Sequence, residues 1–289
     1  MRKILLGTVG LAAMLASPAM AADMRVPPPA PLPVYYNWSG VYGGFNIGGA
    51  WNTVDQTFPN PALLGGVGPG SVANFSTSPN EGILGFHAGA QWQWGAWVLG
   101  VEAALSGCFN ECRQVSGIIP GALPPAGIAP AGTTGTLFEH KITNLFTVGP
   151  RIGYAWDRWM VFATGGWASA NLDAAQCFAN VLATANNAPG PCDGPSPGSR
   201  FSGASRNSDG WYAGGGFDYM VHKGPLVDVI LGVEYQHYDV RSHNAFCFNP
   251  SCGSPTGWDY DLAAKGDIVR ARLTIKTQGY GWWGPSAGY

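Results

Sequence analysis

Alternation of side-chain character is the feature that most constrains the fold of this chain. In residues 83–94 every second position is apolar, whereas the positions between them hold glycine, glutamine or histidine. A period of two is typical of β-strands, whose successive side chains point to opposite faces. In the other stretches of this kind, the charged residues lie on the face opposite the apolar one. A sheet that closes on itself in lipid needs this arrangement, because lipid offers no hydrogen-bond partner to an open sheet edge. The pattern therefore predicts a transmembrane β-barrel.

The composition agrees with a barrel that has a lipid-facing wall and small interior side chains. Glycine accounts for 43 of 289 residues, aromatic residues for 12% and charged residues for 11%, against about 25% charged residues in soluble domains. A secreted β-sandwich would have a similar composition. Without Arg2 and Lys3 the chain has 13 basic and 17 acidic residues, so no basic surface for nucleic acid is expected.

The first 36 residues are predicted to be an export signal followed by a linker. A basic head at residues 1–3, an apolar run at 4–16 and the small-residue site Ala19-Met20-Ala21 indicate a secretory signal peptide over residues 1–21, cleaved near Ala21. Residues 22–36 include the sequence VPPPAPLP and are predicted to form an extended, Pro-rich periplasmic tether. No later stretch has the roughly 18 uninterrupted apolar residues of a transmembrane helix, so a membrane would have to be crossed by strands.

Six cysteines in an exported chain indicate an oxidising compartment. They are spaced as three close pairs, each in a different predicted loop, so three local disulfides are expected although fifteen pairings are formally open. A zinc site is disfavoured because the pairs lack CxxC spacing, and no metal is expected. The pairs are Cys108 with Cys112, Cys177 with Cys192, and Cys247 with Cys252.

Eight strands are predicted from the alternation, and the connections between them are long and short in turn. This order is typical of outer-membrane barrels, which have an even number of strands, short periplasmic turns and long external loops. We therefore predict an all-β, eight-stranded, antiparallel transmembrane up-and-down β-barrel over residues 37–277, with long extracellular loops and an aromatic and Gly-rich C-terminal tail at 278–289. The strands are expected at 41–51, 83–94, 97–105, 142–156, 159–171, 210–221, 226–238 and 269–276; the long loops at 52–81, 106–140, 172–208 and 239–261; and the short turns at 95–96, 157–158 and 222–225.

Two further local features follow from the strand assignment. Pro150 lies within the strand predicted at 142–156 and cannot donate a ladder hydrogen bond, so a local bulge is expected there. Aromatic residues flank two of the two-residue turns and are expected to form an interfacial girdle at the periplasmic rim. The girdle residues are Trp94, Trp97, Trp156, Trp159 and Tyr219.

Eight charged residues, four acidic and four basic, fall on the predicted inner face. Eight strands enclose an interior that side chains roughly fill, and buried charges must pair, since each unpaired one costs several kcal/mol. A structural salt-bridge network is therefore the favoured interpretation, and a gated path for ions or solutes is the alternative. The residues are Glu102, Arg151, Asp218, Asp228, Glu234, Arg270, Arg272 and Lys276.

Catalysis is not expected. His237 and Asp239 share a strand face near the outer rim, where a lipid- or peptide-hydrolysing barrel would place its chemistry. No serine accompanies them in the strand predicted at 226–238, and a histidine near a membrane interface is commonly an amphipathic rim residue. No cofactor is expected either, although Tyr residues and His243 leave haem binding by the loops open as an alternative.

Five segments together resemble a known family. They are YNWSGVYGGFNIGGAW after the tether, then WVLGVEAAL, RIGYAWDRWMVFATGGWA, GVEYQHYDV and VRARLTIK. Over roughly residues 35–277 the chain resembles the small alphaproteobacterial outer-membrane immunogenic or porin-like proteins, which are similar to the OmpA transmembrane domain. In that family an aromatic residue ends the last strand, whereas Thr277 stands here, so either Tyr289 takes this role or insertion tolerates the tail.

The resemblance implies a structural, surface-exposed protein of the cell outer membrane, with weak passage of small solutes as a secondary property. Binding of a ligand, haem or a host partner by the loops is the alternative. The expected partners are outer-membrane lipid, lipopolysaccharide and the barrel-insertion machinery, with peptidoglycan and host molecules as further candidates and no nucleic acid. The protein is expected to be a monomer.

Overall fold

The computed structural model describes residues 36–58, 73–115, 119–120, 133–180, 200–246 and 260–277. The predicted signal peptide at 1–21, residues 22–35 of the tether and the tail at 278–289 lie outside these residues. None of the described residues forms a helix of the length and apolarity that a membrane crossing requires.

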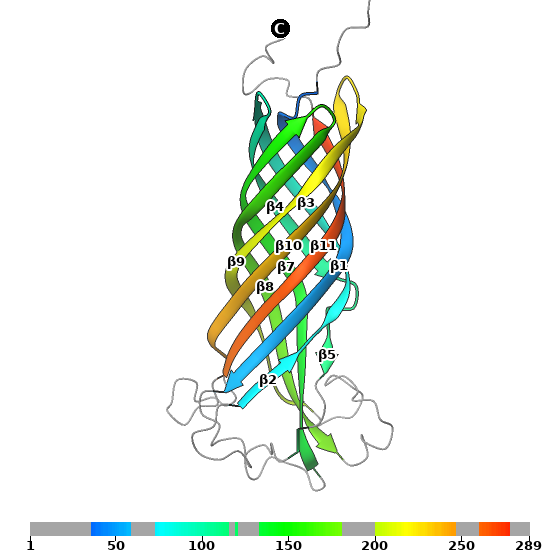
Figure 1. Ribbon diagram of the computed structural model, residues 1–289. Helices are drawn as coiled ribbons and strands as arrows, with labels where there is room; N and C mark the ends of the chain where they lie inside the picture. The colour runs from blue at the N-terminus through cyan, green and yellow to red at the C-terminus, as the bar shows by residue number, and fades with distance from the viewer. Residues whose placement is uncertain are drawn as a thin grey trace, which may run out of the picture. The chain divides into compact units, whose positions relative to one another are not determined.

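Eight of the eleven strands in the described part of the chain close into an antiparallel barrel (Figure 1). Each pairs with the next along the chain, and the last pairs with the first through a ladder from Tyr42–Lys276 to Thr57–Asp261. The prediction of an eight-stranded antiparallel barrel is thus confirmed. The eight strands are β1 (Gly40–Phe58), β3 (Asn80–Trp94), β4 (Trp97–Cys108), β7 (Thr133–Trp156), β8 (Trp159–Asn180), β9 (Arg200–Lys223), β10 (Val227–Phe246) and β11 (Tyr260–Thr277).

Three short strands lie within two of the long connections. They are β2 (Ala73–Thr77), which pairs with β1, and β5 (Gln114–Val115) and β6 (Ile119–Pro120), which both pair with β7. Figure 1 shows β2 and β5 at the end of the barrel opposite the short turns. We call the end with the short turns the turn end and the opposite end the loop end.

Alternation along the strands separates a lipid-type exterior from a packed interior. In β3 the side chain of Phe86 is 56% exposed and that of the next residue, His87, is 3% exposed. The same parity holds along β10, where Leu231, Val233 and Tyr235 face out and Glu234 faces in. The two faces predicted from the sequence are therefore the two faces of the wall.

Two belts of aromatic side chains bound the apolar exterior. At the turn end, Trp94 pairs with Trp97 and Trp156 pairs with Trp159 across two-residue turns. Tyr219 packs against Trp159, with ring centroids 4.6 Å apart. Nearer the loop end, a second set of exposed aromatic residues consists of Trp51, Trp167, Trp211 and Tyr235. The band between these belts has the character of a membrane-spanning segment.

Beyond the second belt the two faces exchange character while the strands continue. On β1, outward Thr53 and Asp55 alternate with buried Val54, and on β10 outward Asp239 and Arg241 alternate with buried Val240. Polar outside and apolar inside is the arrangement of a sheet in water. The barrel therefore extends past its apolar band into a polar surrounding.

This extension corrects the predicted loops at 52–81, 106–140, 172–208 and 239–261. Much of each segment is strand, because β1 continues to Phe58, β7 begins at Thr133, β8 and β9 cover Leu172–Asn180 and Arg200–Ser208, and β10 and β11 reach Phe246 and Tyr260. The loop prediction was wrong because it took the end of the apolar outward face as the end of each strand. That face ends at the second belt, whereas the strands continue.

The prediction of a bulge at Pro150 is also wrong. Pro150 pairs with Val101 of β4, and the register between β7 and β8 is the same on both sides of it, at Val148–Trp167 and Arg151–Thr164. Between these two pairs the ladder is interrupted over Gly149–Pro150. Here the backbones approach closely, since a Cβ atom on Gly149 would lie 2.0 Å from the carbonyl oxygen of Gly165. The missing donor is accommodated without an inserted residue.

Candidate functional site: a lumen closed by ion pairs

The centre of the lumen holds charged side chains from five strands. Because inward positions recur every second residue, β4 presents Glu102, β7 presents Arg151, β9 presents Asp218 and β10 presents Glu234, while β11 presents Arg270 and Arg272. The structure thus brings six of the eight predicted lumen residues into one network, which we call the lumen network.

Glu102 and Glu234 are the acidic centres of the lumen network. Glu102 Oε2 accepts from Arg272 Nη2 at 2.6 Å and lies 3.4 Å from Arg151 Nη1. Glu234 Oε2 accepts from Arg270 Nη2 at 3.0 Å and also from Arg272. Arg151 donates in turn to Asp218. Three guanidinium groups and three carboxylates therefore balance in charge.

Aromatic and polar side chains complete the lumen network. The ring of Phe162 lies under two guanidinium groups, 3.7 Å from Arg151 and 5.4 Å from Arg272, a favourable cation–π arrangement. The hydroxyl of Tyr42 donates to Glu102 at 2.8 Å. The charged side chains of the network are between 0% and 4% exposed. These charges are therefore almost completely shielded from solvent.

The remaining two predicted lumen residues form a separate pair nearer the turn end. Lys276 Nζ lies 2.8 Å from Asp228 Oδ2, and both side chains are buried. Lys276 also donates to the backbone oxygen of Ser39 at 3.1 Å. This pair fastens the chain segment that precedes β1.

That preceding segment closes the turn end of the lumen, which the sequence did not predict. Trp38 is completely buried among Val98, Met160, Phe162 and other apolar side chains. Its backbone is held by Gln93 and Gln91, through a 2.7 Å bond from Trp38 N to Gln93 Oε1 and a 2.7 Å bond from Gln91 Nε2 to Trp38 O. The available signal was a bulky apolar residue directly before the first strand.

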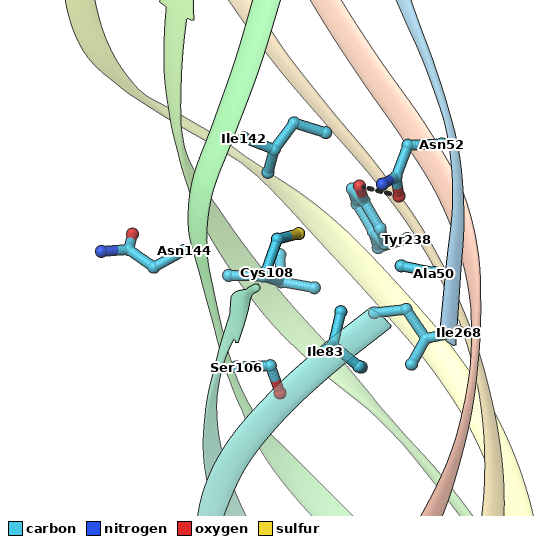
Figure 2. Close-up of a pocket in the computed structure, with 10 residues that line it drawn as sticks. Ala50, Asn52, Ile83, Ser106, Cys108, Ile142, Asn144, Tyr238 and Ile268 are labelled. Carbon is cyan, nitrogen blue, oxygen red and sulfur yellow. Dashed lines mark hydrogen bonds between the residues drawn. The ribbon is translucent and has the colours of Figure 1, made fainter. Parts of the chain in front are cut away.

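On the loop-end side of the lumen network the interior holds a cluster of apolar side chains. Sixteen buried residues form this cluster, among them Val54, Ile142, Leu172 and Val240; we call it the loop-end cluster. A cavity of about 20 Å³ lies beside it (Figure 2), which is space for about one water molecule. Tyr238 donates to Asn52 Oδ1 at 2.7 Å at its edge.

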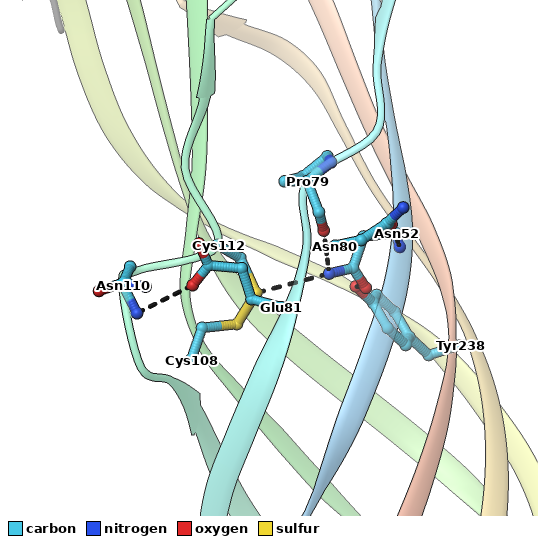
Figure 3. Close-up of a disulfide and its surroundings, with 8 residues drawn as sticks. All are labelled: Asn52, Pro79, Asn80, Glu81, Cys108, Asn110, Cys112 and Tyr238. Carbon is cyan, nitrogen blue, oxygen red and sulfur yellow. Dashed lines mark hydrogen bonds between the residues drawn. A yellow bond between two sulfur atoms is a disulfide. The ribbon is translucent and has the colours of Figure 1, made fainter.

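A disulfide joins Cys108 to Cys112 beside this cavity (Figure 3). Asn52 Nδ2 lies 3.6 Å from Cys112 Sγ and donates to Pro79 O at 2.8 Å. Asn110 N donates to Glu81 Oε2 at 2.9 Å. The first predicted cysteine pair is thus bonded, whereas the side chain of Cys177 and residues Cys192, Cys247 and Cys252 lie outside the described structure.

The rim residues weighed for catalysis are on the outer face. His237 Nδ1 lies 2.9 Å from Asp267 Oδ1, which also accepts from the Tyr235 hydroxyl at 2.6 Å. Asp239 pairs instead with Arg241, 3.0 Å away. His243 has no described side chain. In the described residues no group of three or more His, Cys, Asp or Glu side chains is arranged to hold a metal ion.

Comparison with known proteins adds little beyond the fold. No family model and no curated protein matches the chain, so the family resemblance stays a prediction. Similar solved structures include Neisserial surface protein A, at 13% identity over 82% of this chain and 97% of that one, with a TM-score of 0.30. The outer-membrane protease OmpT of Escherichia coli is 9% identical over 85% and 99%, with a TM-score of 0.38. Ail, the attachment invasion locus protein of Yersinia pestis, is 12% identical over 82% and 99%, with a TM-score of 0.30. The barrel of this chain rests on its own strand pairing, and none of these proteins lends it an activity or a ligand.

Proposed function

We propose that this chain is a non-conducting outer-membrane barrel with a structural, surface-exposed role. The observation that carries the proposal is the lumen network, whose charged side chains are at most 4% exposed. The side chains that line a pore are in contact with water, whereas the charged groups of the lumen network are in contact with one another. The indole of Trp38 closes the turn end in addition.

The outer membrane is favoured over other membranes by the type of wall. The strands cross as a closed antiparallel barrel between two aromatic belts, the architecture of outer-membrane proteins. The predicted signal peptide and the Cys108–Cys112 disulfide suit an exported, oxidised protein. The polar extension beyond the second belt then lies on the outer side of the membrane, in water.

The proposed role is not catalytic. The His237–Asp267 pair orients an imidazole on the outer face, whereas Ser242, the serine of the same strand, has the inward parity of Tyr238 and Val240. The belts and the charged residues just beyond them suit outer-membrane lipid and lipopolysaccharide as the surrounding partners, and the monomer has no sheet edge open between the belts.

Conductance measurements test the closed lumen. Refolded protein, shown to be folded by its heat-modifiable mobility in gels, is expected to give no stable unitary openings in planar bilayers. The physical reason is that the lumen network excludes water between its paired charges. Ion-selective openings whose selectivity changes in Arg151→Glu or Glu102→Lys would contradict the proposal, because the current would then pass through the network.

A further inference from the structure

The wall of the barrel changes its construction at the loop ends of β3 and β4. The β3–β4 ladder ends at Ile83–Cys108 and the β4–β7 ladder ends at Gly107–Asn144. Farther out, β2 continues the wall by pairing with β1, and β5 and β6 continue it by pairing with β7. Within the part of the chain that the structure describes, no ladder joins β2 to β5 or β6. We call this gap the seam.

One buried imidazole spans the seam. His140 of β7 has its Nδ1 atom 3.0 Å from the hydroxyl of Thr77 on β2. Its Nε2 atom lies 2.9 Å from Oε1 of Gln56 on β1. All three side chains are buried. Side-chain hydrogen bonds through His140 thus do at the seam what backbone ladders do elsewhere in the wall.

The disulfide loop is the second closure of the seam. Cys112 points inward and is completely buried in the loop-end cluster. The backbone oxygen of Glu111 accepts a hydrogen bond from the backbone N–H of Ile142 at 3.1 Å. Figure 3 shows this loop beside Asn52 and Pro79, which come from the other flank of the seam. At the seam, the loop-end cluster is therefore covered by a loop and by side chains.

A neutral His140 ring makes both bonds when Nε2 donates to the Gln56 carbonyl oxygen and Nδ1 accepts from the Thr77 hydroxyl. A second proton turns Nδ1 into a donor and reverses its bond with Thr77, whose hydroxyl can also accept. The cost of this proton is therefore a positive charge in a buried site. Burial accordingly lowers the pKa of His140 to about 4. His140 pairs with Ala174 of β8, seven residues beyond Trp167, so it lies outside the apolar band.

Charged groups around the seam do not supply a counterion bonded to the ring. Asp55 of β1 acts on it only at a distance, and Gln114 of β5 is uncharged. The other charged neighbours pair among themselves: Lys141 Nζ lies 3.3 Å from Glu111 and 3.8 Å from Glu139, and Arg113 lies 3.2 Å and 3.5 Å from the same two groups. On β8, Asp173 accepts from Thr143.

We propose that the seam is an acid-responsive opening in the loop-end wall, held shut by neutral His140 and released when this imidazole takes up a proton. Release separates β7 from β1 and β2 and exposes the loop-end cluster to solvent. The proton binds the open form more tightly than the closed form, so closure is most favourable above the ordinary histidine pKa of 6.5 and weakens as the pH falls toward 4. Between pH 7 and pH 5 the ratio of open to closed forms rises about twentyfold.

Hydrogen exchange of the seam measures this ratio directly. The protein is reconstituted in lipid vesicles, and exchange rates of the amides in Ala73–Thr77 are corrected for the intrinsic effect of pH. Between pH 7 and pH 5 the protection of these amides is expected to fall about twentyfold, with unchanged protection in the β9–β10 ladder. Hydrogen bonds from Lys141 and Arg113 hold the pKa of Glu111 below its usual range, so this carboxylate stays ionised over the same interval.

Two variants assign the response to a residue. His140→Gln keeps a donor and an acceptor but stays neutral, and it is expected to lose the pH dependence. His87→Gln is the matched control, because His87 is a buried histidine inside the barrel, bonded to Thr274 at 2.8 Å. The His87→Gln variant is expected to keep the pH dependence. A change below twofold in the unmodified protein, the same fall in His140→Gln, or its loss in His87→Gln would each overturn the proposal.

Discussion

Replacing Glu234 by alanine is expected to lower the free energy of unfolding of the barrel by about 3–5 kcal/mol, the usual cost of breaking a buried ion pair from one side. Glu234 Oε2 accepts from Arg270 Nε at 3.1 Å and Nη2 at 3.0 Å, and also from Arg272. Arg272 keeps Glu102 as a partner, whereas Arg270 retains only a 3.4 Å contact with Ser106. The variant therefore leaves a buried guanidinium without a carboxylate.

Urea unfolding in lipid vesicles, followed by tryptophan fluorescence, measures this loss. Asp239→Ala is the matched control, because it breaks a pair with the exposed Arg241 and should cost under about 1 kcal/mol. The double variant Glu234→Leu/Arg270→Met removes both charges and should recover most of the loss. Equal costs for Glu234→Ala and Asp239→Ala would show that Glu234 is in contact with water.

Replacing Leu231 by arginine is expected to cost about 2–4 kcal/mol in the same assay, because a charge then faces hydrocarbon at the middle of the apolar band. Leu231 points outward on β10, halfway between Val227 at the turn end and Tyr235 in the second belt. It pairs with Leu273 of β11. On the other side it pairs with Tyr219 of β9, and neither Leu273 nor Tyr219 offers a carboxylate to the new charge.

The matched control for Leu231→Arg lies beyond the second belt. Asn207 is exposed on the outer face of β9, four residues before Trp211, and Asn207→Arg should cost no more than about 1 kcal/mol. The comparison must be made in vesicles, where the hydrocarbon layer has a defined thickness. If the two substitutions cost the same, the band between the belts does not face lipid.

The membrane-spanning part of the fold was predictable because one environment on each side of the wall sets one parity. Phe86 and Leu231 are apolar for the same reason, and so Glu102 and Glu234 could be placed inside from sequence alone. The loop-end extension keeps the same inward parity at Tyr238 and Val240. It was missed because water replaces lipid outside, so apolar residues move to the inner face.

Contacts across the lumen could not be predicted, because they depend on how the closed barrel staggers its strands. Arg272 reaches Glu102 from 170 positions away along the chain, and no local pattern encodes that pairing. The same holds for Thr77 and His140 at the seam, and for Trp38, whose burial requires the turn end of the barrel to exist first.

The most direct test of a lipid-embedded barrel with a filled lumen is a spin-label scan along residues 229–233 of β10 in vesicles. Single labels are compared for collision with oxygen, which enters lipid, and with a water-soluble nickel complex. High oxygen accessibility is expected at 229, 231 and 233, and low accessibility to both reagents is expected at 230 and 232. Nickel accessibility at 230 and 232 would reveal a water-filled lumen, and nickel exceeding oxygen at 229, 231 and 233 would place the wall in water; either result contradicts the account.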